Sequence, residues 1–129
     1  MAVDEGLVDW AVEAMEPVGH VTRRPMMGGA TLYCDGIIFA IVSSSGGLWF
    51  KADGESDAAW DDAGCERFTY DMNGKIGSMN YRRAPDDVYD DADEFRRWAM
   101  LAIEAGRRAP KKAPPRRTTR AATRGRGAR

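Results

Sequence analysis

Residues 30–42, with the sequence ATLYCDGIIFAIV, decide the fold class, because they contain two apolar segments joined by a tight turn. The segments 30–34 and 37–42 are rich in the β-branched and aromatic residues that strands favour. Asp35-Gly36 lies between them, and both central positions of a type I′ turn need the positive φ that these residues tolerate. This stretch therefore predicts a β-hairpin.

Similar patterns predict further strands on both sides of the hairpin. These strands cover residues 21–26, 48–51, 67–71 and 75–83. Pro25 has no N–H to donate to a neighbouring strand, so the first of them is expected at a sheet edge. Asn73-Gly74 predicts a second hairpin between the last two, and Pro85 ends the final strand. The sheet should be antiparallel.

Three helices are predicted, over residues 4–16, 56–63 and 91–105. Asp4 and Ser56 suit the N-cap positions of the first two, because their side-chain oxygens can accept a free first-turn N–H. Gly106 is expected to close the last helix. The sequence thus predicts an α+β fold of two layers, an antiparallel sheet with helix–strands–helix–strands–helix order, in one domain over residues 1–106.

Charge divides the chain into two regions. The net charge of −1 conceals a body of residues 1–105 at −11 and a C-terminal region without acids. Residues 107–129 contain three prolines and no Leu, Ile, Val, Phe, Tyr or Trp, so they cannot bury enough apolar surface to offset the entropy of ordering. We expect a disordered basic tail.

The tail is the main candidate for nucleic-acid binding, through release of counterions from phosphates and without sequence preference. Its basic residues are Arg107, Arg108, Lys111, Lys112, Arg116, Arg117, Arg120, Arg124, Arg126 and Arg129. The alternative is a tail that aids solubility or self-association, or that docks on the acidic body.

The strand arginines form a second candidate surface. Arg23, Arg24, Arg82 and Arg83 lie on strands expected in one sheet, and Trp49 and Tyr81 could stack on bases. Neighbours on a strand point to opposite faces, so only one arginine of each pair can share a surface. The alternative is pairing with the many carboxylates of the body.

Few residues suggest catalysis or metal binding. One histidine, His20, and two cysteines, Cys34 and Cys65, are too few for a zinc site, and both thiols are expected to be buried and free. Gly28-Gly29 matches no phosphate-binding motif and suggests a bulge or a close backbone approach. The acidic run 86–94 lacks the glycine of an EF-hand loop and suits helix capping. We expect no catalytic residue, metal or cofactor.

The strand segments resemble the TfoX N-terminal domain family. The residues that carry the resemblance are RPMMGG (24–29), YCDG (33–36), FA (39–40), LWFKAD (48–53), FTY (68–70), MNYR (79–82), APDD (84–87) and WA (98–99). It spans roughly residues 5–105, and it implies a two-layer α+β domain and a role in regulating natural competence genes, without known catalysis.

The sequence therefore favours a non-enzymatic regulatory or adaptor domain whose tail contacts nucleic acid. One alternative is a protein-binding module, including a homodimer; another is a small-molecule or enzymatic function, for which no converging titratable groups are found. No apolar run approaches 18 residues and the first residues lack the features of a signal peptide, so we expect a cytoplasmic protein without membrane association.

Overall fold

The computed structural model describes residues 4–26, 28–44 and 46–109. The elements follow in the order α1 (Glu5–Met15), β1 (Val21–Met26), β2 (Gly29–Cys34), β3 (Ile37–Val42), β4 (Leu48–Lys51), α2 (Asp57–Asp62), β5 (Arg67–Met72), β6 (Lys75–Arg83), the 3-10 helix η1 (Asp86–Tyr89) and α3 (Ala92–Arg108). The predicted α+β class and element order are confirmed, and η1 is the element that the sequence did not predict.

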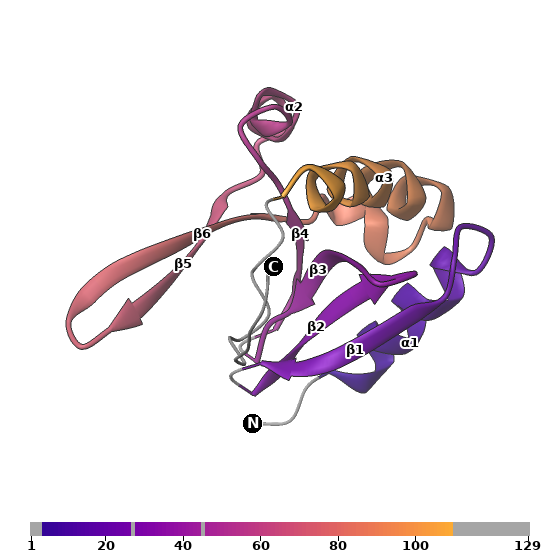
Figure 1. Cartoon of the computed structure of the whole chain (residues 1–129), viewed down its shortest axis with the longest axis horizontal. Coiled ribbons are helices and arrows are strands. Elements are labelled where there is room, and N and C mark those ends of the chain that lie inside the picture. Colours follow the sequence, from indigo (N-terminus) through magenta and orange to yellow (C-terminus); the bar gives the residue numbers. More distant parts are fainter. Residues whose placement is uncertain (1–3, 27, 45, 110–129) are drawn as a thin grey trace, which may run out of the picture.

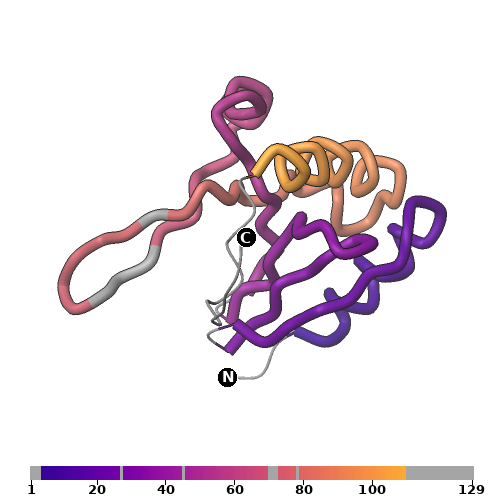
Figure 2. Tube along the Cα trace, viewed as in Figure 1, coloured from indigo at the N-terminus to yellow at the C-terminus, as the bar shows by residue number. Residues whose placement is uncertain are grey.

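All six strands form one antiparallel sheet in the order β1-β2-β3-β4-β6-β5. As predicted, β1 is an edge strand. The hairpin of β5 and β6 extends away from the helices α1 and α3, as the ribbon and the chain trace both show (Figures 1 and 2). The sheet is thus compact at β1–β4 and reaches outward at its other end.

Both predicted hairpin turns have the expected backbone. The φ angles are 49° and 83° at Asp35 and Gly36, and 53° and 81° at Asn73 and Gly74. Left-handed backbone at two consecutive positions is the mark of a type I′ turn, which matches the twist of the strands that it joins. These dipeptides therefore fix the register next to each turn, and the register shifts further along, between Leu32 and Tyr33 in the first hairpin and between Arg67 and Phe68 in the second.

The helices α1 and α3 pack against each other and cover one face of the sheet (Figure 1). Side chains at alternate positions of the strands meet them there, for example Ala40 and Val42 of β3 and Leu48 and Phe50 of β4. The largest fully buried side chains are Trp60, Phe39, Phe50, Phe95, Met15, Leu32, Ile41 and Leu48. In the described ranges no helix is long and apolar enough to span a membrane.

The predicted N-caps hold for the first and last helices but not for α2. Asp4 Oδ1 accepts the Leu7 N–H at 3.1 Å, and Asp91 Oδ1 accepts the N–H groups of Asp93 and Glu94. Ser56 does occupy the N-cap position of α2, yet its side chain makes no capping bond. Its hydroxyl instead accepts the Asp53 N–H at 3.1 Å, which fixes the turn before the helix.

The predicted end of the last helix near Ala105 is wrong, because α3 continues through Arg108. Gly106 is not a cap but a contact point between α3 and β3. A Cβ at this position would lie 2.3 Å from the backbone oxygen of Ile38. The missing side chain therefore lets the helix approach the strand, and Arg107 and Arg108 belong to the folded domain.

Gly29 shows the same kind of contact, as the sequence suggested for the Gly28-Gly29 pair. A Cβ on Gly29 would lie 2.1 Å from the backbone oxygen of Val42. This distance is well inside van der Waals contact, so only glycine lets the start of β2 meet the end of β3.

Candidate nucleic-acid interface

The first two basic residues of the predicted tail are paired with carboxylates of the domain. Arg108 Nε and Nη2 donate to Asp53 Oδ2 and Oδ1 at 2.7 and 3.0 Å, and Arg108 also lies 3.4 Å from Glu55. Arg107 pairs with Glu104 one turn earlier in α3 at 3.3 Å. The Arg108 contacts fix the C-terminal end of α3 to the loop before α2.

The Arg108–Asp53 pair also changes the acidity of Asp53. The hydrogen bond from the Arg108 guanidinium, with smaller contributions from Ser56, lowers the pKa of Asp53 to about 2. A bidentate arginine–carboxylate pair of this kind is geometrically specific. Arg108 is therefore engaged within the domain, whereas Lys111, Lys112, Arg116, Arg117, Arg120, Arg124, Arg126 and Arg129 lie outside the described residues.

Two of the four strand arginines are committed to other contacts. Arg23 forms a bidentate pair with Glu5 of α1 at 2.8 and 3.1 Å, so it joins the edge strand to the helix layer. Arg82 is only 4% exposed and donates to Asp61, Asp57 and the Cys65 backbone oxygen. Arg82 therefore holds β6 against α2, and it has no surface to offer a ligand.

The other two strand arginines, Arg24 and Arg83, lie on the opposite face of the sheet. The Arg24 guanidinium lies over the Tyr33 ring, 5.7 Å from its centroid, and that of Arg83 lies over the Trp49 ring at 5.3 Å. Arg83 also forms an exposed ion pair with Glu66 at 3.2 Å. The expectation that only one arginine of each pair would share a surface is confirmed.

A third cation on this face was missed by the sequence reasoning. Lys51 Nζ lies over the Tyr81 ring, 5.2 Å from its centroid. The register of β4 and β6 pairs Lys51 with Tyr81 directly, and Trp49 with Arg83. Lys51 and Tyr81 meet because β4 pairs with β6, which is distant in sequence. The segment 48–51 alone does not predict this pairing.

The strand register aligns the face into one row that crosses five strands. Arg24 pairs with Thr31, Thr31 with Ile41, Ile41 with Trp49, and Trp49 with Arg83. Residues paired across an antiparallel sheet point to the same side. Arg24 and Arg83 therefore stand at the two ends of one row, roughly 19 Å apart at four strand spacings.

Charge is sorted between the strands and the rest of the folded part. The strands contain seven basic residues and one acid, Asp71, whereas the remaining residues of 4–109 contain four basic and 19 acidic ones. The acids lie mainly in the helices and in the loops that precede them. The strands are therefore rich in cations and the rest of the folded part in carboxylates, while Arg23 and Arg82 point toward the helices.

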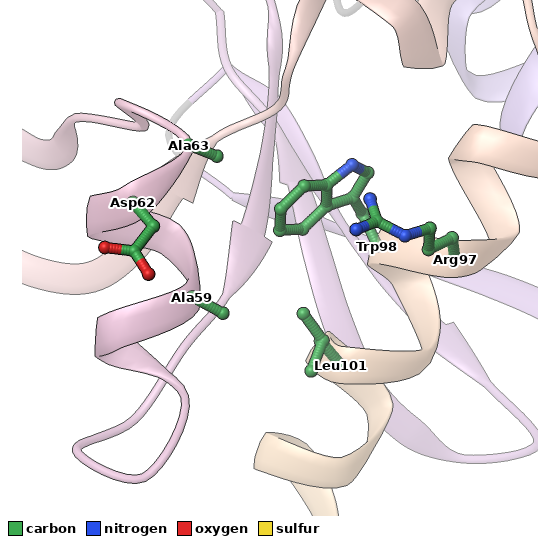
Figure 3. Close-up of a pocket in the computed structure, with 6 residues that line it drawn as sticks. All are labelled: Ala59, Asp62, Ala63, Arg97, Trp98 and Leu101. Atoms are coloured by element: carbon green, nitrogen blue, oxygen red, sulfur yellow. The ribbon is translucent and has the colours of Figure 1, made fainter.

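A second surface feature is an open groove between α2 and α3, with a cavity volume of about 610 Å³ (Figure 3). Ala59 of α2 and Ala63, which follows that helix, face Trp98 and Leu101 of α3 across it, with Asp62 and Arg97 at its margin. Its lining is mostly apolar and its two charged residues have opposite signs. This chemistry suits a protein side chain better than a phosphate.

The residues considered for catalysis occupy ordinary structural positions. Both cysteines are buried and unpaired, and burial raises the pKa of each thiol. The His20 side chain is exposed at the start of β1, and its backbone N–H donates to Asp35 Oδ1 at 3.0 Å. Among the described residues no three His, Cys, Asp or Glu side chains are grouped to hold a metal ion.

Fold and surface together define a small α+β domain with helices on one sheet face and cations beside aromatic rings on the other. Residues 13–106 match the family model of the TfoX N-terminal domain, so the chain belongs to that family. The resemblance found in the strand segments is confirmed.

A relative of established name supports the same assignment. The chain is 33% identical over 67 residues to the DNA transformation protein TfoX1 of Aliivibrio fischeri (strain ATCC 700601 / ES114). The matched region is 52% of this chain and 32% of that relative. The chain thus matches about a third of the relative's length.

Proposed function

We propose that this chain is a cytoplasmic, non-enzymatic regulatory domain that contacts nucleic acid through its basic C-terminal segment. Family membership supports a role related to competence regulation, and the Aliivibrio relative is named a DNA transformation protein. The segment 110–129 would hold the domain near DNA or RNA, and the folded domain would act on a regulatory partner.

The single observation that carries this proposal is the charge of residues 110–129, which contain eight basic residues and no acid. The segment follows directly on α3, whose last turn is fixed by the Arg108–Asp53 pair. Eight cations without an acid can each displace a condensed counterion from a phosphate, so this binding would be electrostatic and without sequence preference.

The test is a titration of labelled duplexes of two unrelated sequences at several salt concentrations. If roughly four of the eight tail cations contact phosphates, the log–log salt slope should be about −3.6, with little difference between sequences. A chain with all eight changed to Gln should lose most of this binding. A chain with the six tail arginines changed to Lys keeps the charge and should retain it.

The apolar groove between α2 and α3 favours a second candidate, a protein-binding module in the form of a homodimer. The groove places Leu101 and Trp98 beside Ala59 and Ala63 without filling the space between them (Figure 3). Light scattering after size-exclusion chromatography tests it. Leu101→Glu should convert a dimer to a monomer, and the neighbouring exposed Met100→Glu should not; a monomeric parent protein rules this candidate out.

A further inference from the structure

We propose that the sheet face opposite α1 and α3 binds single-stranded nucleic acid, with Arg24 and Arg83 contacting phosphates and the Tyr33 and Trp49 rings contacting bases. This surface belongs to the folded domain, and its binding would not require residues 110–129. This surface, the cation–aromatic face, consists of Arg24, Tyr33, Trp49, Lys51, Tyr81 and Arg83.

The placement of these side chains is fixed by the sheet. Alternation along the strands sends Ala40, Val42, Leu48 and Phe50 to the helix side, so the positions between them point the other way. The helix contacts of the sheet run through α3 on β3 and β4, and through α1 on β1. The cation–aromatic face is thus the side of the sheet on which neither long helix of the described residues packs.

The middle of the face is closed and its ends are accessible. Ile41 is 1% exposed, whereas Arg24 and Arg83 are exposed and Tyr33 and Trp49 are half-buried. Burial, with a smaller effect of the nearby Tyr33, raises the pKa of Tyr81 to about 12, so Tyr81 forms part of the floor. A ligand would meet two sites, each with one arginine and one ring, at opposite ends of the row.

The chemistry of each site fits a nucleotide. A guanidinium over a ring can turn to a phosphate oxygen and leave the ring face to a base, and base–aromatic stacking does not depend on sequence. A duplex keeps its base faces stacked inside, so only an unpaired strand can use both groups. A surface that contacts only phosphates would not distinguish single-stranded from duplex nucleic acid.

Charge on the face is complementary to such a strand. Arg83 pairs with Glu66, and both side chains are more than half exposed. Exposed pairs of this kind contribute little, so phosphate can displace the carboxylate. The acids of the helix layer repel phosphate, so a strand would be disfavoured on the helix side.

The experiment uses the full-length chain with the eight basic residues of 110–129 changed to Gln, so that tail binding does not contribute. Fluorescence anisotropy of labelled oligo(dT) and of a duplex of equal length is measured at several salt concentrations. The double change Arg24→Gln with Arg83→Gln should reduce the single-strand salt slope by about 1.4, since two phosphate contacts are lost. Thermal melting verifies that each variant is folded.

Arg97→Gln is the matched control, because Arg97 is also exposed and lies over a tryptophan, Trp98, but on the helix layer. It should leave the salt slope unchanged. Trp49→Leu should weaken oligo(dT) binding roughly ten-fold or more, and Trp49→Phe, which retains a ring, should restore most of it. Glu66→Gln should strengthen binding more than Glu13→Gln, an equal charge change on α1.

Three results would overturn the proposal. One is no detectable oligo(dT) binding by the tail-neutralised chain; the second is duplex binding as tight as single-strand binding. The third is displacement of oligo(dT) by polyglutamate as effective as by unlabelled oligonucleotide, which would indicate a docking face for acidic protein segments. None of these results bears on the tail, whose binding is lost or kept with its own eight substitutions.

Discussion

Replacing Gly106 by alanine would place a methyl group where α3 meets the backbone of β3. The new Cβ would lie 2.3 Å from the Ile38 oxygen and 2.8 Å from Ile37 Cγ2. A carbon–oxygen contact is normally no shorter than about 3.3 Å, so the helix must retreat by roughly 1 Å. The neighbours that pack with it, Ala102, Ile103 and Ala105, are all buried and would lose contact with the sheet.

Two opposing effects set the size of the change. Alanine favours a helix over glycine by about 1 kcal/mol. Overpacking of a well-packed contact costs about 1–3 kcal/mol, and here the obstacle is backbone that cannot rotate away. Because the obstacle is backbone, we expect the upper end of this range: Gly106→Ala should lower the free energy of unfolding by up to about 2 kcal/mol, which lowers Tm by up to roughly 8–16 °C for a domain of this size.

Thermal and urea denaturation of both proteins measure this effect, with Gly6→Ala as the matched control. Gly6 lies in α1, where a Cβ would have its nearest neighbour, Asp4 Oδ1, at 3.5 Å, an ordinary contact. Gly6→Ala should therefore raise stability by up to about 1 kcal/mol. If both variants gain stability alike, α3 does not contact β3 as described and the argument for Gly106 fails.

Three further changes test other contacts of the domain. Arg82→Met should lower the free energy of unfolding, measured in urea, by about 1–2 kcal/mol, because it removes the hydrogen bonds of a buried guanidinium but leaves carboxylates that solvent can reach, Asp61 being 65% exposed. Asp53→Asn should lower the free energy of unfolding at pH 7 and make it less dependent on pH in acid. The reason is that the pKa of the Asp53 carboxyl falls from 3.8 to about 2 on folding. Its contribution to stability is therefore complete above pH 4 and is lost as the pH drops through 2. Labelling of Cys34 and Cys65 by a thiol reagent at pH 7.5 should be slow and should become fast only in denaturant, and rapid labelling of either thiol in the native protein would contradict its burial.

The strands and turns followed from local chemistry. Asp35-Gly36 and Asn73-Gly74 are restricted by their own backbone preferences, so the sequence predicted both hairpins and the bounds of β1, β3, β4 and β6. The cap of α3 at Asp91 was equally local. Such features need no knowledge of which strand lies beside which.

The misjudged features depend on contacts between distant segments. Nothing in the sequence distinguishes Arg82 from its neighbour Arg83. Arg82 is buried because α2 brings Asp57 and Asp61 next to it, whereas Arg83 points to the other face and is exposed. Gly106 resembled a helix cap because glycine serves both purposes. Its role depends on the distance between α3 and β3, which the sequence does not contain.

The separation of carboxylates from strand cations gives the folded domain an electric dipole that runs through its two layers. In solution such a dipole turns the molecule in the field of a polyanion before contact, so that the sheet arrives first and the helices face away. Residues 4–109 contain 11 basic and 20 acidic residues, so this orienting effect acts against a net repulsion of the domain from the polyanion, and added salt weakens both. Orientation on the polymer would be set by long-range forces, and the helix layer, with its groove between α2 and α3, would remain turned outward for a second molecule.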